Sequence, residues 1–388
     1  MKKNGNEKSG GVVDKILGFI SGDKTSPFAV PIISILLSLI VASLLLAALG
    51  KSPVQGFSSF LQGCGLLPKP SYASGKGMIT DFFSFLGILA PMILASLGIV
   101  MGLRANMFNI GVSGQMLSAG FLATVIIGYS GLDAVIAKPL VIVIGMVVGC
   151  LLGSFVGLLK YKFNIHEVVA TIIIDYIINY IVGFFINSKF ADPFTRASRA
   201  CSDAARLTVN NVDLGGYKIA FPFGIIVAII AVILIKIFLD KTVAGFELKN
   251  VGLNKDCARY AGMNVNKNIM ISMGMSGLLA GLAGVTYYLG YYNNIYPNTL
   301  SSMGYDAIAV ALLGNSNPVG AVFGAFLITI LQAGTIYMNS TIGVSKEISS
   351  VITGIILLFS ACGGFLVYLS KKQLIKRQES HKEAKEEK

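Results

Sequence analysis

The feature that most constrains this chain is a succession of long apolar stretches separated by polar segments. An α-helix of about 20 apolar residues crosses the ~30 Å hydrocarbon core of a bilayer. Backbone groups in lipid must be satisfied within the segment, so stretches of this kind form helices. We expect spans at residues 30–49, 83–103, 112–129, 135–159, 166–187, 221–239, 269–290, 298–314, 319–338 and 349–369. The sequence therefore predicts an all-α, polytopic membrane protein with about ten transmembrane helices.

Composition and charge agree with this fold class. Only 13% of the 388 residues are charged, against about a quarter in soluble domains. The net charge of +12 comes from basic residues in loops and tails, which is typical of cytoplasmic-loop bias and does not indicate nucleic-acid binding. An even number of spans with this bias places both termini in the cytoplasm. The segment 188–220 is an exception with four cations, but the rule weakens for long loops.

Three parts of the chain differ in character. Residues 1–28 form a cytoplasmic segment in which Val12, Ile16 and Ile20 share one helical face, which indicates either a surface amphipathic helix or a loosely ordered tail. This lead has no cleavage site, so we expect it to remain as an uncleaved anchor. Residues 29–370 form the transmembrane domain, with a polar loop at 240–268, and 371–388 form a charged cytoplasmic tail. Five cysteines without a C-x-x-C pair and two histidines give no metal site.

A polar stretch, Lys241–Lys267, directly precedes the uncharged stretch Ile269–Gly290. Within it, Asn254–Ala261 has the features of a short helix, because Asn254 is a favoured N-cap residue and Gly262 can end the helix in a left-handed conformation. A capped helix between two spans suits contact with a soluble partner. The alternative is an ordinary solvated loop.

Three blocks in this region, in this order, resemble a known family. Val251–Asn254, Ala258–Gly262 and Ser276–Gly284 are similar to the coupling segment of permease subunits of ABC importers for ribose, nucleosides and branched-chain amino acids. The resemblance implies a type II importer fold and a separate ATPase docked on this helix. The residues that would make that contact are Asn254, Asp256, Ala258, Arg259, Tyr260 and Gly262.

Two further segments carry the same resemblance, especially to the nucleoside-transporting branch. Phe108–Gly111 with Gly114–Gln115 is one, and Gly304–Asn315 is the other. That branch often has Glu where this chain has Ser113, so we carry over no acidic role there. Each segment leads into or forms the third span of a five-span half, which predicts inverted halves with a binding site between them.

Polar residues within these spans are the candidates for the substrate pathway. Irregular polar backbone at membrane depth is tolerated only inside protein or beside a wet cavity. Placing a carboxylate within the membrane costs free energy, and such residues are often functional. Asp175 can equally be a structural, hydrogen-bonded group. The predicted pathway residues are Phe108, Asn109, Gln115, Asp175, Asn179, Tyr305, Asp306 and Asn315.

Glycines at every fourth position mark close helix contacts in two spans. Such a face exposes bare backbone and permits another helix to approach closely. The residues predicted to pack in this way are Gly145, Gly149, Gly153, Gly157, Gly277 and Gly281.

The chain contains no G-x-x-x-x-G-K-[ST] loop, so we expect no ATP hydrolysis by this subunit and no enzymatic activity. The resemblance implies a multi-pass permease of a bacterial cell membrane that imports a nucleoside. Its expected partners are an ABC ATPase that binds ATP and Mg²⁺, a second and different permease chain, and an extracellular substrate-binding lipoprotein. A simple sugar is the next substrate candidate and a branched-chain amino acid the third.

An ion-coupled secondary transporter is an alternative class, with Asp175 and Asp306 binding the coupling ion. That class gives no role to the charged helix before residue 269.

Overall fold

The computed structural model describes residues 26–70, 72 and 76–344, with scattered positions between 351 and 373. Apart from those positions, the predicted amphipathic helix near the N-terminus, the span at 349–369 and the tail 371–388 lie outside the described residues. The chain divides into two compact units, Val54–Ser349 and a smaller unit of Met1–Pro53 with Ser350–Lys388. In the smaller unit, helix α2 (Ser26–Ala48) occupies the first predicted span.

The larger unit is a bundle of helices. Their bounds are α3 (Pro53–Gly63), α4 (Met78–Arg104), α5 (Val112–Ala123), α6 (Ala134–Phe163), α7 (Glu167–Phe185), α8 (Gly224–Lys241), α9 (Val243–Leu253), α10 (Lys255–Tyr260), α11 (Val265–Thr286), α12 (Met303–Leu313) and α13 (Pro318–Ile342). Single π-helical turns continue α5, α7 and α11, namely η1 (Thr124–Gly128), η2 (Ile186–Phe190) and η3 (Tyr287–Tyr291).

Five helices of the described part are long and apolar enough to cross a membrane, counting the π-helical turns with α7 and α11. They are α4, α6, α7, α11 and α13. The stretches expected at 112–129 and 298–314 contain shorter apolar helices, α5 with η1 and α12. The protein is therefore a mostly helical, polytopic membrane protein, with some spans shorter than the sequence suggested.

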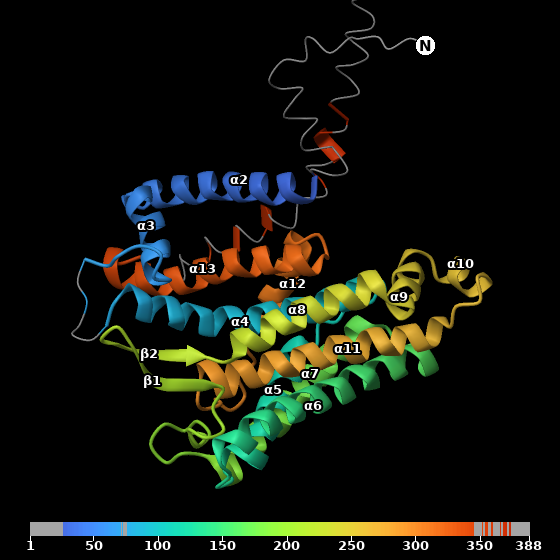
Figure 1. Ribbon diagram of the computed structural model, residues 1–388. Helices are drawn as coiled ribbons and strands as arrows, with labels where there is room; N and C mark the ends of the chain where they lie inside the picture. Colours follow the sequence, from blue (N-terminus) through green and yellow to red (C-terminus); the bar gives the residue numbers. More distant parts are fainter. Residues whose placement is uncertain are drawn as a thin grey trace, which may run out of the picture. The chain divides into compact units, whose positions relative to one another are not determined.

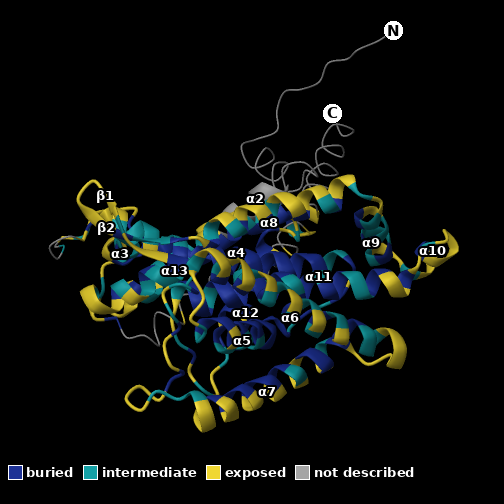
Figure 2. Cartoon of the chain, turned by 60° about the horizontal axis from the view of Figure 1, so that its bottom comes forward, coloured by how far each residue is buried: buried dark blue, intermediate teal, exposed yellow. Residues whose placement is uncertain are grey.

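Helices α4 and α11 form the centre of the larger unit. The apolar window of α4 is 83% buried and that of α11 is 78% buried, against 33% for α6. Figure 2 shows the same contrast, with α4 and α11 largely dark blue. The two helices pack against each other, and the Ser272 hydroxyl of α11 donates to the Met101 carbonyl of α4 at 2.9 Å. The exposed apolar face of α6 is what a lipid-facing helix requires.

The glycine face of α6 lies against α11. A Cβ atom built on Gly149 would lie 2.8 Å from the Cα of Gly281, and one on Gly153 would lie 2.9 Å from the Cα of Gly277. Gly145 also adjoins Gly281, whereas Gly157 meets Met270. The two backbones therefore touch along three successive turns, which larger side chains would prevent.

A β-hairpin lies at the opposite end of the bundle from α9 and α10 (Figure 1). Strands β1 (Thr208–Leu214) and β2 (Tyr217–Pro222) pair antiparallel, with a bulge between Val209 and Val212. The turn uses Gly215 and Gly216 at φ of +61° and +87°, the conformation of a tight hairpin turn. The prediction of a purely α-helical chain missed this element.

Candidate functional site

Hydrogen bonds between buried side chains stabilise the first broken segment, residues 105–111. The Asn109 amide donates to the Gln115 side chain at 3.0 Å and to the Ser276 hydroxyl at 2.8 Å. The Asn109 side-chain oxygen accepts from the Gly111 amide at 3.0 Å. Asn109, Gln115 and Ser276 are at most 1% exposed. This network satisfies the irregular backbone between α4 and α5 and joins it to α11.

Asp175 of α7 holds the start of α5. Helix α5 has no side-chain cap from its own N-cap residue, Gly111, and one Asp175 carboxylate oxygen accepts from the Gly114 amide at 3.1 Å. Gly114 allows this approach, because a Cβ there would lie 2.9 Å from the Cα of Asp175. A carboxylate at a helix N-terminus is favoured by the free amides and by the helix dipole.

Two acceptor oxygens on α7 remain without a hydrogen-bond partner among the described residues. They are the second oxygen of Asp175 and the side-chain oxygen of Asn179. Asp175 is 1% exposed and Asn179 is 8% exposed. Buried polar atoms nearly always form hydrogen bonds, so two acceptors without a partner, one helical turn apart, need an explanation.

The second broken segment, residues 292–302, contacts the start of α5, which follows the first broken segment. The Ser113 hydroxyl of α5 donates to the Ser301 carbonyl at 2.8 Å. A Cβ on Gly304 would lie 2.7 Å from the Ser113 amide nitrogen. Ser113 is fully buried in this contact, which leaves no room for the larger Glu common in the nucleoside branch.

Tyr305 and Asp306 lie in the first turn of α12. The Asp306 carboxylate accepts from the Gln332 amide of α13 at 2.7 Å. Tyr305 is 44% exposed and follows Gly304, which contacts Ser113 of α5, while the Gly114 amide of α5 donates to Asp175 of α7. The start of α5 therefore brings predicted residues of α7 and α12 near each other.

The remaining predicted pathway residues lie elsewhere. Asn315 is exposed in the turn after α12, at φ of +52°. Phe108 is half-buried in the first broken segment.

The polar segment before α11 contains two short helices. The Asn254 side chain caps α10, accepting from the amides of Asp256 and Cys257 at 3.0 Å each. Gly262 follows at φ of +81°, and its amide donates to the Arg259 carbonyl at 3.0 Å. The expected capped helix is present, one residue shorter at its end.

Helix α10 projects from the bundle (Figure 1). Most of its residues are exposed, both apolar and charged ones. Tyr260 is 94% exposed and Leu253, just before α10, is 84% exposed. Asp256 and Arg259 form an ion pair at 3.8 Å with both side chains exposed, whereas Ala258 is buried beneath them. A partner would therefore contact a surface of mixed chemistry.

Helix α9 connects α10 to the bundle. A Cβ on Gly252 would lie 2.9 Å from the carbonyl carbon of Arg104, at the end of α4. The Glu247 carboxylate accepts from the Asn268 amide of α11 at 3.0 Å. Force applied at α10 would therefore reach both central helices.

Sequence reasoning missed Arg104, which links the end of α4 to the turn between α12 and α13. Its guanidinium Nε donates at 2.7 Å to the carbonyl of Ser316, in the turn between α12 and α13. The two residues are 212 positions apart. A lone arginine at the end of an apolar span was the available signal.

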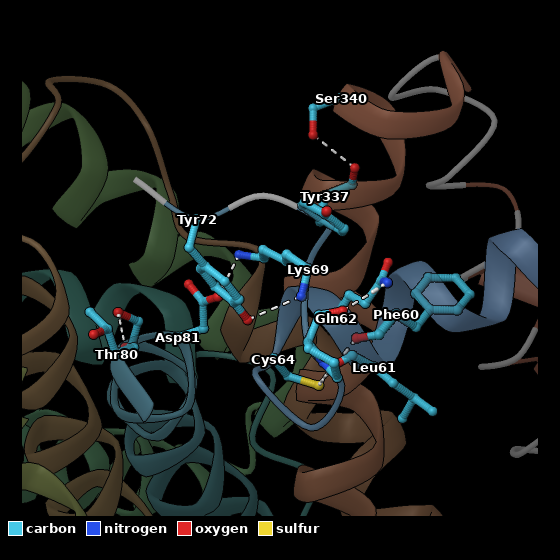
Figure 3. Close-up of polar contacts among 12 residues, drawn as sticks. Phe60, Leu61, Gln62, Cys64, Lys69, Tyr72, Thr80, Asp81, Tyr337 and Ser340 are labelled. Carbon is cyan, nitrogen blue, oxygen red and sulfur yellow. Dashed lines mark hydrogen bonds and ion pairs between the residues drawn. The ribbon is translucent and has the colours of Figure 1, made fainter. Parts of the chain in front are cut away.

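A second missed cluster ties the loop before α4 to the bundle (Figure 3). The Lys69 ammonium pairs with Asp81 of α4 at 2.7 Å and lies 4.8 Å from the centre of the Tyr337 ring of α13. The Lys69 backbone amide donates to the Tyr72 hydroxyl at 3.2 Å. One lysine thus joins the loop to two long helices.

Comparison with known proteins identifies the family. The family described as "Branched-chain amino acid transport system / permease component" matches residues 82–361. The nucleoside ABC transporter permease protein NupB of Lactococcus lactis subsp. cremoris is 32% identical, over 93% of this chain and 98% of its own length. The guanosine ABC transporter permease protein NupP of Bacillus subtilis is 33% identical, over 87% of this chain and 94% of its own.

A glucose ABC transporter permease protein, TsgB13 of Haloferax volcanii, is 25% identical over 86% of each chain. No solved structure matches. The family match, over residues 82–361, covers most of the chain and includes both broken segments and the helices α9 and α10. The chain belongs to the permease-component family of the branched-chain amino acid transport systems.

Proposed function

We propose that this chain is the membrane-spanning subunit of a bacterial ABC importer for a nucleoside. The observation that carries the proposal is the near full-length similarity to permeases named for nucleosides and for guanosine. Permease components are transport subunits and not enzymes, so ATP hydrolysis, with its bound ATP and Mg²⁺, belongs to a separate ATPase. A simple sugar is the second candidate, because a glucose permease is also similar over most of the chain.

The proposed docking site for the ATPase is α10 with the end of α9. The residues that carry it are Asn254, Asp256, Ala258, Arg259, Tyr260 and Gly262. Closure of the ATPase would push on α10, and the contacts of α9 with α4 and α11 would carry the movement into the bundle. A helix that is capped at both ends and projects from the bundle is suited to this role.

The arrangement of the halves supports an inverted repeat. Helix α4 starts beside the hairpin, where the centres of the Phe83 and Phe221 rings lie 5.8 Å apart, and runs away from it to Arg104. Helix α11 runs the other way and ends beside β1, where the Thr208 hydroxyl donates to the Gly290 carbonyl at 2.8 Å. Each is followed by an irregular segment and a short helix, α5 or α12. We propose that the substrate passes near the place where the second broken segment and α12 contact the start of α5.

The proposed pathway combines exposed and buried residues. Tyr305 and Asp306 would contact the solute, and Asp175 and Asn179 would lie beside them. Asn109 and Gln115, inside the chain, would hold the first segment in shape.

The proposed topology places both termini, α9 and α10 in the cytoplasm and the hairpin outside. The positive-inside bias supports this orientation. A substrate-binding lipoprotein would deliver the nucleoside at the hairpin end, and a second, different permease chain would complete the pathway.

The test is uptake by cells that express this chain with its genomically linked ATPase, second permease and binding protein. Radiolabelled guanosine, uridine, ribose and glucose would be supplied separately, before and after ATP depletion and after collapse of the proton gradient. We expect nucleoside uptake that requires ATP and survives loss of the gradient. Uptake of glucose or ribose alone would favour the sugar candidate, and dependence on the ion gradient would contradict an ABC importer.

A further inference from the structure

Two helices of the larger unit expose tyrosines partway along their length. On α7, Tyr176 is 54% exposed and Tyr180, one turn later, is 66% exposed. On α12, Tyr305 is 44% exposed. The start of α5 contacts both helices, because the Gly114 amide donates to Asp175 of α7 and a Cβ on Gly304 of α12 would meet Ser113. Tyr305 therefore lies near Asp175 and its neighbour Tyr176, and we call Tyr176, Tyr180 and Tyr305 the tyrosine face.

This face lies near the middle of the membrane. Tyr176 is nine residues after Glu167, the first residue of α7, or about 13 Å along the helix axis. Tyr305 is eight residues before Leu313, the last residue of α12, or about 12 Å by the same rise. Both distances are near half of the ~30 Å hydrocarbon thickness.

Lipid does not explain tyrosines at this depth. On lipid-facing surfaces tyrosine concentrates at the two interfaces, where its hydroxyl reaches water and headgroups. A hydroxyl placed against acyl chains at the midplane has no hydrogen-bond partner, which is costly. These hydroxyls need a polar neighbour, and water beside α7 and α12 would supply it, although the same side of α7 also exposes the apolar residues Ile173 and Ile177.

The oxygens of Asp175 and Asn179 that lack hydrogen-bond partners indicate which kind of solute passes beside α7 and α12. Both are acceptors, so they need a solute or water that donates hydrogen bonds. A nucleoside has sugar hydroxyls that donate and a flat base whose π face stacks on aromatic rings. A free sugar has the donors but not the flat π face. Together the acceptors and the tyrosines fit a nucleoside better than a sugar.

We propose that the tyrosine face lines the water-filled pathway, and that the base of the nucleoside stacks on Tyr176 and Tyr305 as its sugar passes Asp175 and Asn179. This inference rests on the proposed function. It assigns Tyr176, Tyr180 and Tyr305 as residues that select for a base-bearing substrate.

The first test is the water accessibility of the face in the complete transporter. Tyr176→Cys and Tyr305→Cys would be made in a chain whose native cysteines are replaced, with Phe155→Cys on the exposed apolar face of α6 as the matched control. A charged, water-soluble thiol reagent should label both tyrosine positions and not position 155, and added nucleoside should slow the labelling. No labelling at positions 176 and 305 would show that the face lies in lipid or in a dry subunit contact, and would overturn the inference.

The second test is uptake by substituted transporters. Tyr305→Phe keeps the ring and should leave nucleoside uptake within about twofold, whereas Tyr305→Leu should lower it about tenfold, the effect expected from losing one base–aromatic stack. Tyr176→Leu should act similarly, and Phe155→Leu should have no effect. Full uptake by both leucine variants at normal yield would refute the stacking role.

The two tests separate this inference from the proposed function. If the unsubstituted transporter takes up no nucleoside, the proposed function fails, but the labelling without nucleoside still decides whether the face is wet. If nucleoside uptake is normal and the face is unlabelled, only the inference fails.

Discussion

The contact between α6 and α11 predicts a graded response to single methyl groups. Gly149→Ala would drive a Cβ into the carbonyl oxygen of Gly277 and place it 2.8 Å from both the Cα and the amide nitrogen of Gly281. These are backbone atoms and cannot rotate away. Since ordinary contacts of this kind lie at 3.4–4 Å, the helices would have to separate by more than about 1 Å along the whole contact.

The expected cost follows from two opposing effects. Overpacking of a close-packed contact costs about 1–3 kcal/mol, and the upper end applies where backbone meets backbone. Replacing Gly by Ala within a helix returns about 1 kcal/mol. We therefore expect Gly149→Ala to destabilise the protein by about 2 kcal/mol.

Two matched substitutions serve as controls. At Gly157 the nearest atoms are the Met270 Cα at 3.2 Å and the Met273 Cβ at 3.3 Å, so a shift of a few tenths of an ångström suffices and Gly157→Ala should be nearly neutral. At Gly131 nothing lies within 4 Å, so Gly131→Ala should have no effect.

Thermal melting of the purified protein in detergent, read with its yield, gives the test. The melting temperature should fall clearly for Gly149→Ala and remain near the unsubstituted value for the other two. Equal melting temperatures for Gly149→Ala and Gly157→Ala would refute the argument that backbone contact sets the helix separation.

Three further predictions concern the ends of the bundle. Arg259→Glu should abolish uptake while the yield and melting temperature stay unchanged, because its ion pair is exposed and worth little; normal uptake would contradict the docking assignment. Arg104→Met should destabilise the protein by about 1–3 kcal/mol, because the Ser316 carbonyl loses a charged donor at 2.7 Å; an unchanged melting temperature would show that the link is dispensable. Asp81→Asn should lower the free energy of unfolding by about 1 kcal/mol, since the ion pair with Lys69 is only partly buried. The difference in melting temperature from the unsubstituted protein should become smaller in high salt; a salt-independent difference would argue against a charge effect.

Local chemistry explains why α10 was predictable. Asn254 and Gly262 lie at the two ends of a short polar run. The Asn254 side chain can cap the N-terminus of a helix, and Gly262 can adopt the left-handed conformation that ends one. The close-packed face of α6 was equally predictable, because glycines at every fourth position lie on one side of a helix whatever the partner is.

Contacts between distant parts of the sequence were not predictable. Nothing in the sequence near Arg104 indicates Ser316, and the hydrogen bond between Asp175 and Gly114 depends on how α5 and α7 pack. The hairpin was missed because a short strand pair in a helical membrane protein has a weak signal, although Gly215 and Gly216 marked its turn.

The caps of α10 also bear on how a partner can be recognised. A free peptide of six residues does not hold a helix in water, because nucleation is unfavourable at that length. Here Asn254 and Gly262 fix both ends before any partner arrives, so association costs little further conformational entropy. Because α10 is already helical, it can transmit movement from a bound partner to the bundle as a rigid element. Weakening either cap should reduce this coupling before it lowers the stability of the protein.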